Sequence, residues 1–249
     1  MSTVTFLGTG GARVLVFKQL LASGGLWLDF EGTRLSLDPG PGALVQATKR
    51  KLYPTQLSGI ILSHRHLDHS SDVNAMIEGM TTGGLEPKGT VFAPHDALEE
   101  DPVVLRYLRS YVERMVTLHE GGEYEIGSVR FRTPVRHRHP VETYGFIFQG
   151  QGPSLGVITD TAYFPELAEH YRADYLIVNV VLMKPFPAEH LTIEEAKQLI
   201  AVIRPKQAVL THFGMSVWRA KPWEIAARLT EETGVQVKAA RDGMRLELL

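Results

Sequence analysis

The chain has 249 residues, of which 44% are hydrophobic and 22% are charged, and its formal net charge is −2. This composition is typical of a globular enzyme, and the nearly balanced charge argues against a broadly basic nucleic-acid-binding surface. The absence of cysteine excludes disulfides, cysteine-ligated zinc and a cysteine nucleophile, so any transition-metal site must use His, Asp and Glu side chains.

The first elements are short strands separated by glycine-rich turns. Residues 4–7 predict a strand that runs into four residues containing three glycines, which allow a tight turn and close backbone approach. We favour a simple connection at this turn over an anion-binding role. Residues 26–30 and 34–37 predict a β-hairpin. Asp38 follows this hairpin and either supports a metal site from beneath or serves as a turn or capping residue. A helix is expected over about 42–51.

A dense group of potential metal ligands follows the hydrophobic run over residues 57–62. In an extended segment His64 and His66 point to the same side, and the chain must turn before Asp68 and His69 can reach the same pocket. Imidazoles and a carboxylate suit zinc, with manganese or iron as second choices. The sequence therefore predicts a metal site at the end of a buried strand.

The middle of the chain combines two expected helices with several short strands. Apolar residues at helical spacing predict a helix over 72–80. Asp101 and Pro102 form a helix start signal, and we expect that helix to run to about Arg114 with its arginines in solvent. Short strands are expected over residues 91–93, 116–119, 123–126 and 129–135.

The last of these strands has one buried face and one basic face, and it leads into Arg136, His137, Arg138 and His139. A histidine at a strand end beside arginines suits a metal site that receives an anionic substrate. His137 and His139 are both candidate ligands on this pattern, because both can point to one side. Arg136 and Arg138 are candidate substrate contacts.

Further along the chain, buried strands again end in potential ligands. The strand over 155–159 ends at Asp160, which is costly to bury unless it is paired or binds metal, although it can also cap a helix. Another apolar strand is expected over 175–181. The strand over 208–210 leads to His212 in the same way.

His190 lies just before an expected helix that begins at Thr192 and ends at Ile203. Thr192 and Glu195 form a capping box. The positive end of the helix dipole disfavours an imidazolium and lowers the pKa of His190. A last helix is expected over 222–233.

Seven potential ligands thus follow apolar strands, which is enough for two metal ions bridged by a carboxylate and a hydroxide. The residues from His64 to His69 match the HxHxDH motif, and almost the whole chain resembles the metallo-β-lactamase-fold hydrolases. It is most similar to their ribonuclease Z and PhnP-like phosphodiesterase branch. The further matching segments are FLGTGG at 6–11, the YGF strand at 144–146 after a histidine, HLT at 190–192 and THFG at 211–214.

The resemblance implies an α/β fold, the αββα sandwich of two mixed β-sheets with helices outside and the site at one edge. It also favours His139 over His137 as a ligand. The implied ligands of one metal ion are His64, His66 and His139. Those of the other are Asp68, His69 and His212, with Asp160 as the bridge.

The implied activity is that of a phosphodiesterase with two divalent ions, zinc first, in which a metal-bound hydroxide attacks phosphorus. Asp68 would orient or deprotonate the water. His190 would donate a proton to the leaving oxygen or a hydrogen bond to the phosphate. An acyl hydrolase of the lactonase or thioesterase type is the alternative on the same scaffold, followed by an iron-dependent oxidoreductase and a non-enzymatic metal-binding protein.

The chain departs from the ribonuclease Z pattern in two places. Only about 20 residues separate His139 from Asp160, which leaves no room for the long tRNA-gripping arm. The arginine that usually follows the THxS element is missing after Gly214. We therefore expect a small or medium anionic phosphodiester as the substrate, with nucleic acid as a further option and a homodimer as a candidate assembly.

The expected location is the cytoplasm, because a chain without cysteine forms no disulfides. The sequence also shows no signal-peptide pattern and no run of about 18 apolar residues. No linker rich in proline or serine divides the sequence. We expect one domain over residues 1–249.

Overall fold

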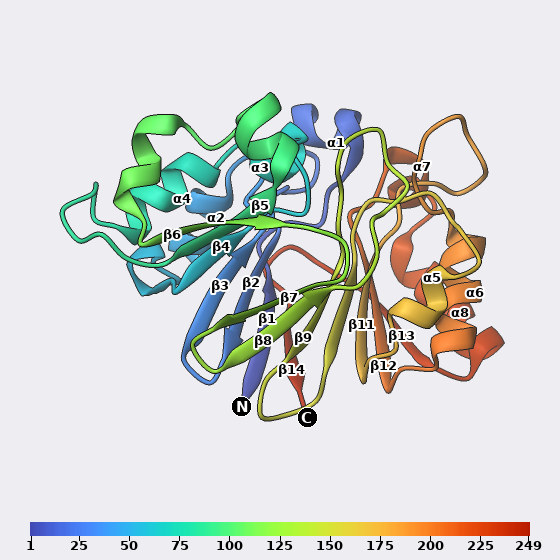
Figure 1. The fold of residues 1–249 in the computed structure, drawn as a ribbon. Coiled ribbons are helices and arrows are strands. Elements are labelled where there is room, and N and C mark those ends of the chain that lie inside the picture. Colours follow the sequence, from blue (N-terminus) through green and yellow to red (C-terminus); the bar gives the residue numbers. More distant parts are fainter.

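Two seven-stranded β-sheets face each other, and helices cover their outer faces (Figure 1). The computed structural model describes all 249 residues. The αββα sandwich implied by the resemblance is confirmed. None of the helices has the length and the apolar run that a membrane crossing requires.

The first sheet has the strand order β14-β1-β2-β3-β4-β5-β6. Its central strands β3, β4 and β5 run parallel, so their carboxyl ends lie at one edge. The strands are β14 (Arg245–Leu248), β1 (Ser2–Phe6), β2 (Leu26–Phe30), β3 (Thr33–Leu37), β4 (Gly59–Ile61), β5 (Thr90–Pro94) and β6 (Arg114–Leu118).

The second sheet has the order β13-β12-β11-β10-β9-β8-β7. Here β10, β11, β12 and β13 are parallel, and the remaining strands are antiparallel. The strands are β13 (Gln236–Ala239), β12 (Gln207–Thr211), β11 (Tyr175–Asn179), β10 (Leu155–Ile158), β9 (Phe146–Gln149), β8 (Val129–Thr133) and β7 (Gly122–Ile126).

The helices lie outside the sheets or at the edge opposite the two chain termini (Figure 1). The α-helices are α1 (Ala12–Lys18), α2 (Ala43–Lys49), α3 (Leu67–Ser70), α4 (Val73–Met80), α5 (Leu167–His170), α6 (Ile193–Ile203), α7 (Met215–Arg219) and α8 (Pro222–Thr233). Further helical turns that are not α-helical are η1 (Pro54–Gln56), η2 (Asp96–Glu100) and η3 (Arg106–Tyr111).

Three apolar clusters hold these layers together. The central cluster joins the facing sides of the two sheets and takes buried residues from both ends of the chain, such as Val4 and Leu248. The other two clusters pack helices against the outer faces of the two sheets. Burial of this apolar surface is the main favourable contribution to folding, and it fixes the strand ends from which the site is built.

Several helices have the bounds that local sequence signals predict. In α6 the side chain of Thr192 accepts a hydrogen bond from the Glu195 amide, while the Glu195 carboxylate accepts from the Thr192 amide. Helix α8 begins at Pro222, and Gly234 after it adopts a left-handed conformation with φ of 69°. The predictions for these two helices and for α2 and α4 are confirmed.

The helix expected from Asp101 to Arg114 is wrong. The chain forms only the short turn η3 there, and β6 begins at Arg114. One reason is that the Leu105 amide donates to Oδ1 of Asn74 at 2.9 Å, so it is not available for a helical bond. A second is that the Glu113 amide bonds the carbonyl of Gly89, because the chain must be extended to pair β6 with β5.

Candidate metal centre

Strand ends of both sheets bring the predicted ligands to one edge of the sandwich. Asp160 and His212 follow the parallel strands β10 and β12, and Asn179 is the last residue of β11 between them. His64 follows β4 in the facing sheet. Because parallel strands place their carboxyl ends together, residues distant in sequence meet at this edge.

The first ligand group is formed by three imidazole rings. Nε2 of His64 and Nε2 of His139 each lie 3.1 Å from Nδ1 of His66. Ligand nitrogens about 2.0–2.1 Å from a tetrahedral zinc ion lie about 3.3 Å apart. The three nitrogens are therefore arranged as a metal site requires.

Hydrogen bonds on the far side of two of these rings fix which nitrogen is free. Nδ1–H of His139 donates to the Glu189 carbonyl oxygen at 3.0 Å, since a carbonyl can only accept. Nδ1 of His64 lies 2.9 Å from Oγ of Ser63. This arrangement leaves the Nε2 lone pair of each ring directed at the shared point.

The second group combines two histidines with two carboxylates. Its members are Asp68, His69, Asp160 and His212. Oδ2 of Asp160 lies 3.3 Å from Nε2 of His69, and its Oδ1 lies 3.4 Å from Nδ1 of His212. Oδ2 of Asp68 lies 3.4 Å from Nε2 of His212. The two groups adjoin, because the ring centroids of His64 and His69 are 4.1 Å apart.

Buried nitrogens in this second group lack hydrogen-bond partners. They are Nε2 of His69 and both ring nitrogens of His212. A buried polar atom without a partner costs free energy, and native structures keep few of them. Coordination to a divalent metal would satisfy imidazole nitrogens and carboxylate oxygens together. The residues present therefore fit such an ion.

The charges of neighbouring side chains strongly shift the pKa values of His69 and Asp160. Burial alone would lower the pKa of His69, but the carboxylates of Asp160, Asp68 and Asp38 outweigh it and hold that pKa well above its usual value. Burial would likewise raise the pKa of Asp160, but His212 and His69 hold it well below the usual value. The Asp160 carboxylate is therefore negative and available as a ligand.

Asp38 lies beneath the site, so the question left open by the sequence is answered in favour of a partner role. Its Oδ2 lies 2.9 Å from Nδ1 of His69 and accepts from the Ser63 hydroxyl at 2.6 Å. Its Oδ1 accepts from the Ser63 amide at 2.6 Å. Asn179 supports Asp160 similarly, donating to its Oδ1 at 2.9 Å. Sequence reasoning did not single out Ser63 or Asn179 for such roles, although Ser63 follows β4 and Asn179 ends β11, two strands that lead to the site.

His190 lies beside the two groups. Its Nδ1 is 3.6 Å from Oδ2 of Asp160 and has no hydrogen-bond partner, and its ring is 5.2 Å from that of His139. An isolated parallel β-bridge between the backbones of Leu182 and Thr192 positions the segment before α6. Burial lowers the pKa of His190, which favours its neutral form, and its unpartnered nitrogen lies close to the predicted ligands.

His137 lies outside the site. Its Nδ1–H donates to the Asp160 carbonyl oxygen at 3.3 Å, and its Nε2 accepts from the Tyr171 hydroxyl at 2.7 Å. Burial lowers the pKa of His137 to about 3. The structure thus brings His139 to the ligand group and gives His137 a packing role.

The two arginines that the sequence offers as substrate contacts are exposed. The guanidinium of Arg138 lies 4.7 Å from the centre of the Phe164 ring. The backbone of Arg136 forms an isolated antiparallel β-bridge with that of Tyr144. Neither guanidinium has a hydrogen bond or ion pair to a residue of the ligand groups.

The glycine-rich turn contacts His212 directly. A Cβ atom at Gly11 would lie 2.1 Å from Nδ1 of His212, so only glycine leaves room for that ring. The Gly11 amide bonds the Phe213 carbonyl at 2.9 Å, and the Phe213 amide bonds the Thr9 carbonyl at 2.8 Å. The Thr9 amide donates to Oδ1 of Asp242, and the Gly10 amide donates to the Ala22 carbonyl. The turn therefore makes a close connection and offers no free amides to an anion.

The sequence matches a family of known proteins and individual relatives. The model described as "Beta-lactamase superfamily domain" matches residues 33–213. The uncharacterized protein MJ1374 of Methanocaldococcus jannaschii is 30% identical over 253 residues, which cover 99% of this chain and 95% of that protein. Ribonuclease BN of Escherichia coli is 27% identical over 152 residues, 57% of this chain and 47% of the enzyme. The match thus spans about half of ribonuclease BN.

Solved structures share the fold at low sequence identity. The metallo-β-lactamase fold protein YhfI from Bacillus subtilis superposes with a TM-score of 0.83 at 17% identity over 98% of both chains. A diphosphatase from the PhnP family gives 0.75 at 22% identity, covering 98% of this chain and 96% of the other. The short form of human tRNase Z gives 0.72 at 20% identity over 99% of both chains.

Proposed function

The chain belongs to the β-lactamase superfamily, and from this membership we propose that it is a phosphodiesterase that uses two divalent metal ions, zinc first. Its metallo-β-lactamase fold and its His/Asp cluster are those of a metal-dependent hydrolase. The number of ions, the identity of the metal and the phosphodiester substrate are the proposed parts.

The observation that carries the proposal is the pair of adjoining ligand groups. His64, His66 and His139 would hold one ion. Asp68, His69 and His212 would hold the other, with Asp160 between them as the shared carboxylate. Five imidazoles and two carboxylates without any thiolate suit zinc, and they also accept manganese or iron.

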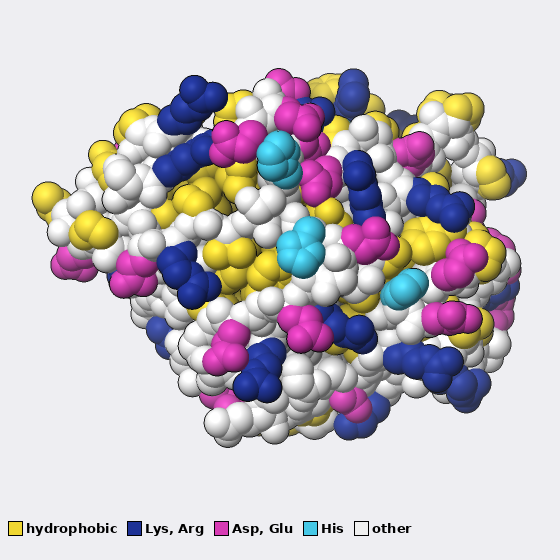
Figure 2. Space-filling view, in the orientation of Figure 1, with side chains coloured by type: hydrophobic (Ala, Val, Ile, Leu, Met, Phe, Trp, Pro, Cys, Tyr) yellow, Lys and Arg dark blue, Asp and Glu magenta, His cyan; other side chains and the backbone are white.

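A phosphodiester is the substrate class that the relatives support. The names of ribonuclease BN, tRNase Z and the PhnP-family diphosphatase describe enzymes that act on phosphorus–oxygen bonds. The segment between His139 and Asp160 holds only β9, β10 and the turns around them, which leaves no arm to grip a folded tRNA. Figure 2 shows basic and acidic side chains intermingled over one face, without a continuous basic surface. We therefore propose a small or medium diester.

Bound cations would lower the pKa of a water towards about 7 and would stabilise the negative charge that develops on the phosphate. The Asp68 carboxylate can accept a proton from that water. His190 can donate a hydrogen bond to the phosphate or a proton to the leaving oxygen, and an anionic substrate beside it would favour its protonated form.

We further propose that residues 1–249 act as one domain. The central cluster contains Val4 from the first strand and Leu248 from the last. Separating the two halves of the chain would expose this core.

The test of the substrate class is a comparison of three model substrates with the metal-loaded protein. We expect hydrolysis of bis-p-nitrophenyl phosphate with a kcat/KM at least tenfold above that for a thioester or a lactone. Metal-loaded protein that cleaves the thioester or the lactone faster than the diester would replace the phosphodiesterase with an acyl hydrolase.

A further inference from the structure

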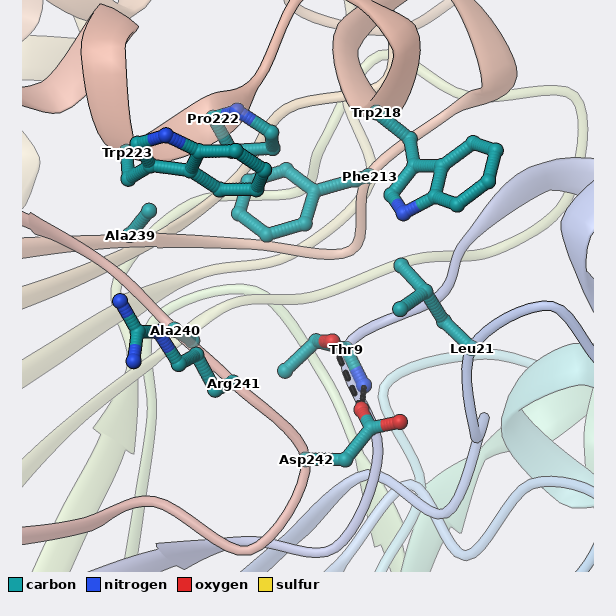
Figure 3. Close-up of a pocket in the computed structure, with 10 residues that line it drawn as sticks. All are labelled: Thr9, Leu21, Phe213, Trp218, Pro222, Trp223, Ala239, Ala240, Arg241 and Asp242. Carbon is teal, nitrogen blue, oxygen red and sulfur yellow. Dashed lines mark hydrogen bonds between the residues drawn. The ribbon is translucent and has the colours of Figure 1, made fainter.

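A cavity lies beside the segment that follows His212, and most of its lining side chains are apolar, three of them aromatic. It has a volume of about 400 Å³, and its lining comes from α7, α8, the segment after β13 and the turn around Thr9 (Figure 3). None of the residues that line it belongs to the two ligand groups, and Phe213, the residue after His212, is held by backbone hydrogen bonds to Thr9 and Gly11. The cavity is therefore separate from the proposed site of hydrolysis.

Three aromatic rings form one wall of this cavity. Phe213 is buried, whereas Trp223 at the rim is 53% exposed. Figure 3 shows Trp218 and Trp223 on the same side of the space, with Ala240 and Thr9 opposite. Tryptophan provides a large flat contact surface that favours stacking with another planar ring. An exposed tryptophan beside a cavity is thus available to a ligand.

The polar groups of the cavity leave donors free. No internal hydrogen bond uses the indole N–H of Trp218 or Trp223, and in Figure 3 the Trp218 nitrogen faces the space. The Arg241 side chain is exposed and forms no ion pair.

The carboxylate of Asp242, next to Arg241, already accepts hydrogen bonds from within the chain. Oδ1 of Asp242 accepts from the amide and the hydroxyl of Thr9 at 2.9 and 2.7 Å, and its Oδ2 accepts from the Ala22 amide at 2.9 Å. Asp242 thus holds the turn and does not pair with Arg241. The guanidinium is the charged group left to meet a ligand.

We propose that this cavity binds a planar aromatic acid. The ring would lie against Trp218 and Trp223, and the anionic group would pair with Arg241, which suits carboxylates and phosphates because of its planar donors. A volume of about 400 Å³ holds one or two fused rings with a short acidic substituent. This inference goes beyond the proposed hydrolysis and does not depend on it.

The chain carries its own internal reporter for this site. It contains three tryptophans, and the third, Trp27, is buried in the first sheet with 1% exposure. In a ¹H–¹⁵N spectrum of the full chain, indole-3-acetate should shift the indole signals of Trp218 and Trp223 and leave that of Trp27 unchanged. Trp218→Phe and Trp223→Phe assign the signals.

The charge requirement is tested with a matched neutral ligand. Arg241→Gln should weaken binding of indole-3-acetate about three- to tenfold and leave binding of the isosteric indole-3-acetamide unchanged. Arg228→Gln, at another exposed arginine on α8, is the control and should change neither. A parallel titration with adenosine 5′-monophosphate distinguishes an aromatic carboxylate from a nucleotide, and binding of either one supports the site.

Three results would overturn the proposal. One is that neither acid shifts the two indole signals at concentrations up to several millimolar. Another is that wild type binds indole-3-acetate and indole-3-acetamide with equal affinity. The third is a dimer in sedimentation that Trp223→Ala converts to monomers, because the cavity would then be covered by a second copy of the chain.

Discussion

Oδ2 of Asp38 lies 2.9 Å from Nδ1 of His69, directly behind the nitrogen that faces the second ligand group. A carboxylate in this position fixes the tautomer of the ring and increases the basicity of its other nitrogen. Asp38 also accepts two hydrogen bonds from Ser63, whose hydroxyl in turn contacts His64. One buried carboxylate therefore orients a histidine of each ligand group.

Asp38→Asn should weaken metal binding about 10- to 100-fold, because the amide cannot support the His69 imidazole as a charged partner does. The left-handed backbone at Asp38, with φ of 53°, also tolerates Asn, so the fold should persist. The measurement is competition for zinc with a chromophoric chelator. Asp29→Asn, at a surface pair with Arg34, is the control and should bind zinc like wild type. Unchanged affinity in Asp38→Asn would remove Asp38 from the account.

Gly11→Ala should displace the His212 ring and lower occupancy of the second metal position. The added methyl group would lie 2.1 Å from Nδ1 of His212, closer than any tolerable contact. We expect the metal content per chain to fall by about one ion while unfolding remains cooperative. Gly152→Ala, where a Cβ meets nothing within 4 Å, should keep the wild-type content. Full occupancy in Gly11→Ala would show that His212 is not a ligand.

The two neighbouring histidines should behave in opposite ways. His139→Gln should lose metal with little change in the stability of the metal-free protein. His137→Gln should keep its metal but lose about 2 kcal/mol of unfolding free energy, because a buried hydrogen bond to Tyr171 is broken. Metal analysis of both purified variants, and urea denaturation of both variants after treatment with a chelator, separate the two effects. Metal loss from His137→Gln alone would reverse the assignment.

His190→Gln should reduce kcat about 10²-fold or more for a diester with an alkyl leaving group, which needs protonation. The loss should be smaller for bis-p-nitrophenyl phosphate, whose leaving group is stable as an anion. Metal content should not change, because three or four other residues occupy each ligand group. Equal losses with both diesters would indicate that His190 binds the phosphate and does not act as the proton donor.

The sequence predicts those parts of the molecule that depend on local chemistry. The capping box of Thr192 and Glu195 and the Pro222 start of α8 satisfy backbone groups within one helical turn, so their patterns identify the elements. The region after Asp101 has equally clear local signals. There the long-range bonds from Asn74 to Leu105 and from Gly89 to Glu113 override them.

The candidate site shows the same division. Its dense motif from His64 to His69 can be found by spacing alone. The support given by Asp38 and Asn179 arises only when neighbouring parallel strands end together, and the need for glycine at position 11 depends on a ring 201 residues away, at position 212. Such contacts leave no local pattern, because sheet pairing creates them.

The most direct test of the two-metal phosphodiesterase is metal analysis of the purified chain together with hydrolysis of bis-p-nitrophenyl phosphate by wild type and Asp160→Ala. Asp160 contacts both histidines of the second group and is the proposed shared ligand. We predict two divalent ions per wild-type chain, with fewer ions and at least a 10²-fold lower kcat/KM in the variant. Equal diester hydrolysis by the two proteins at equal metal content would contradict the proposed function.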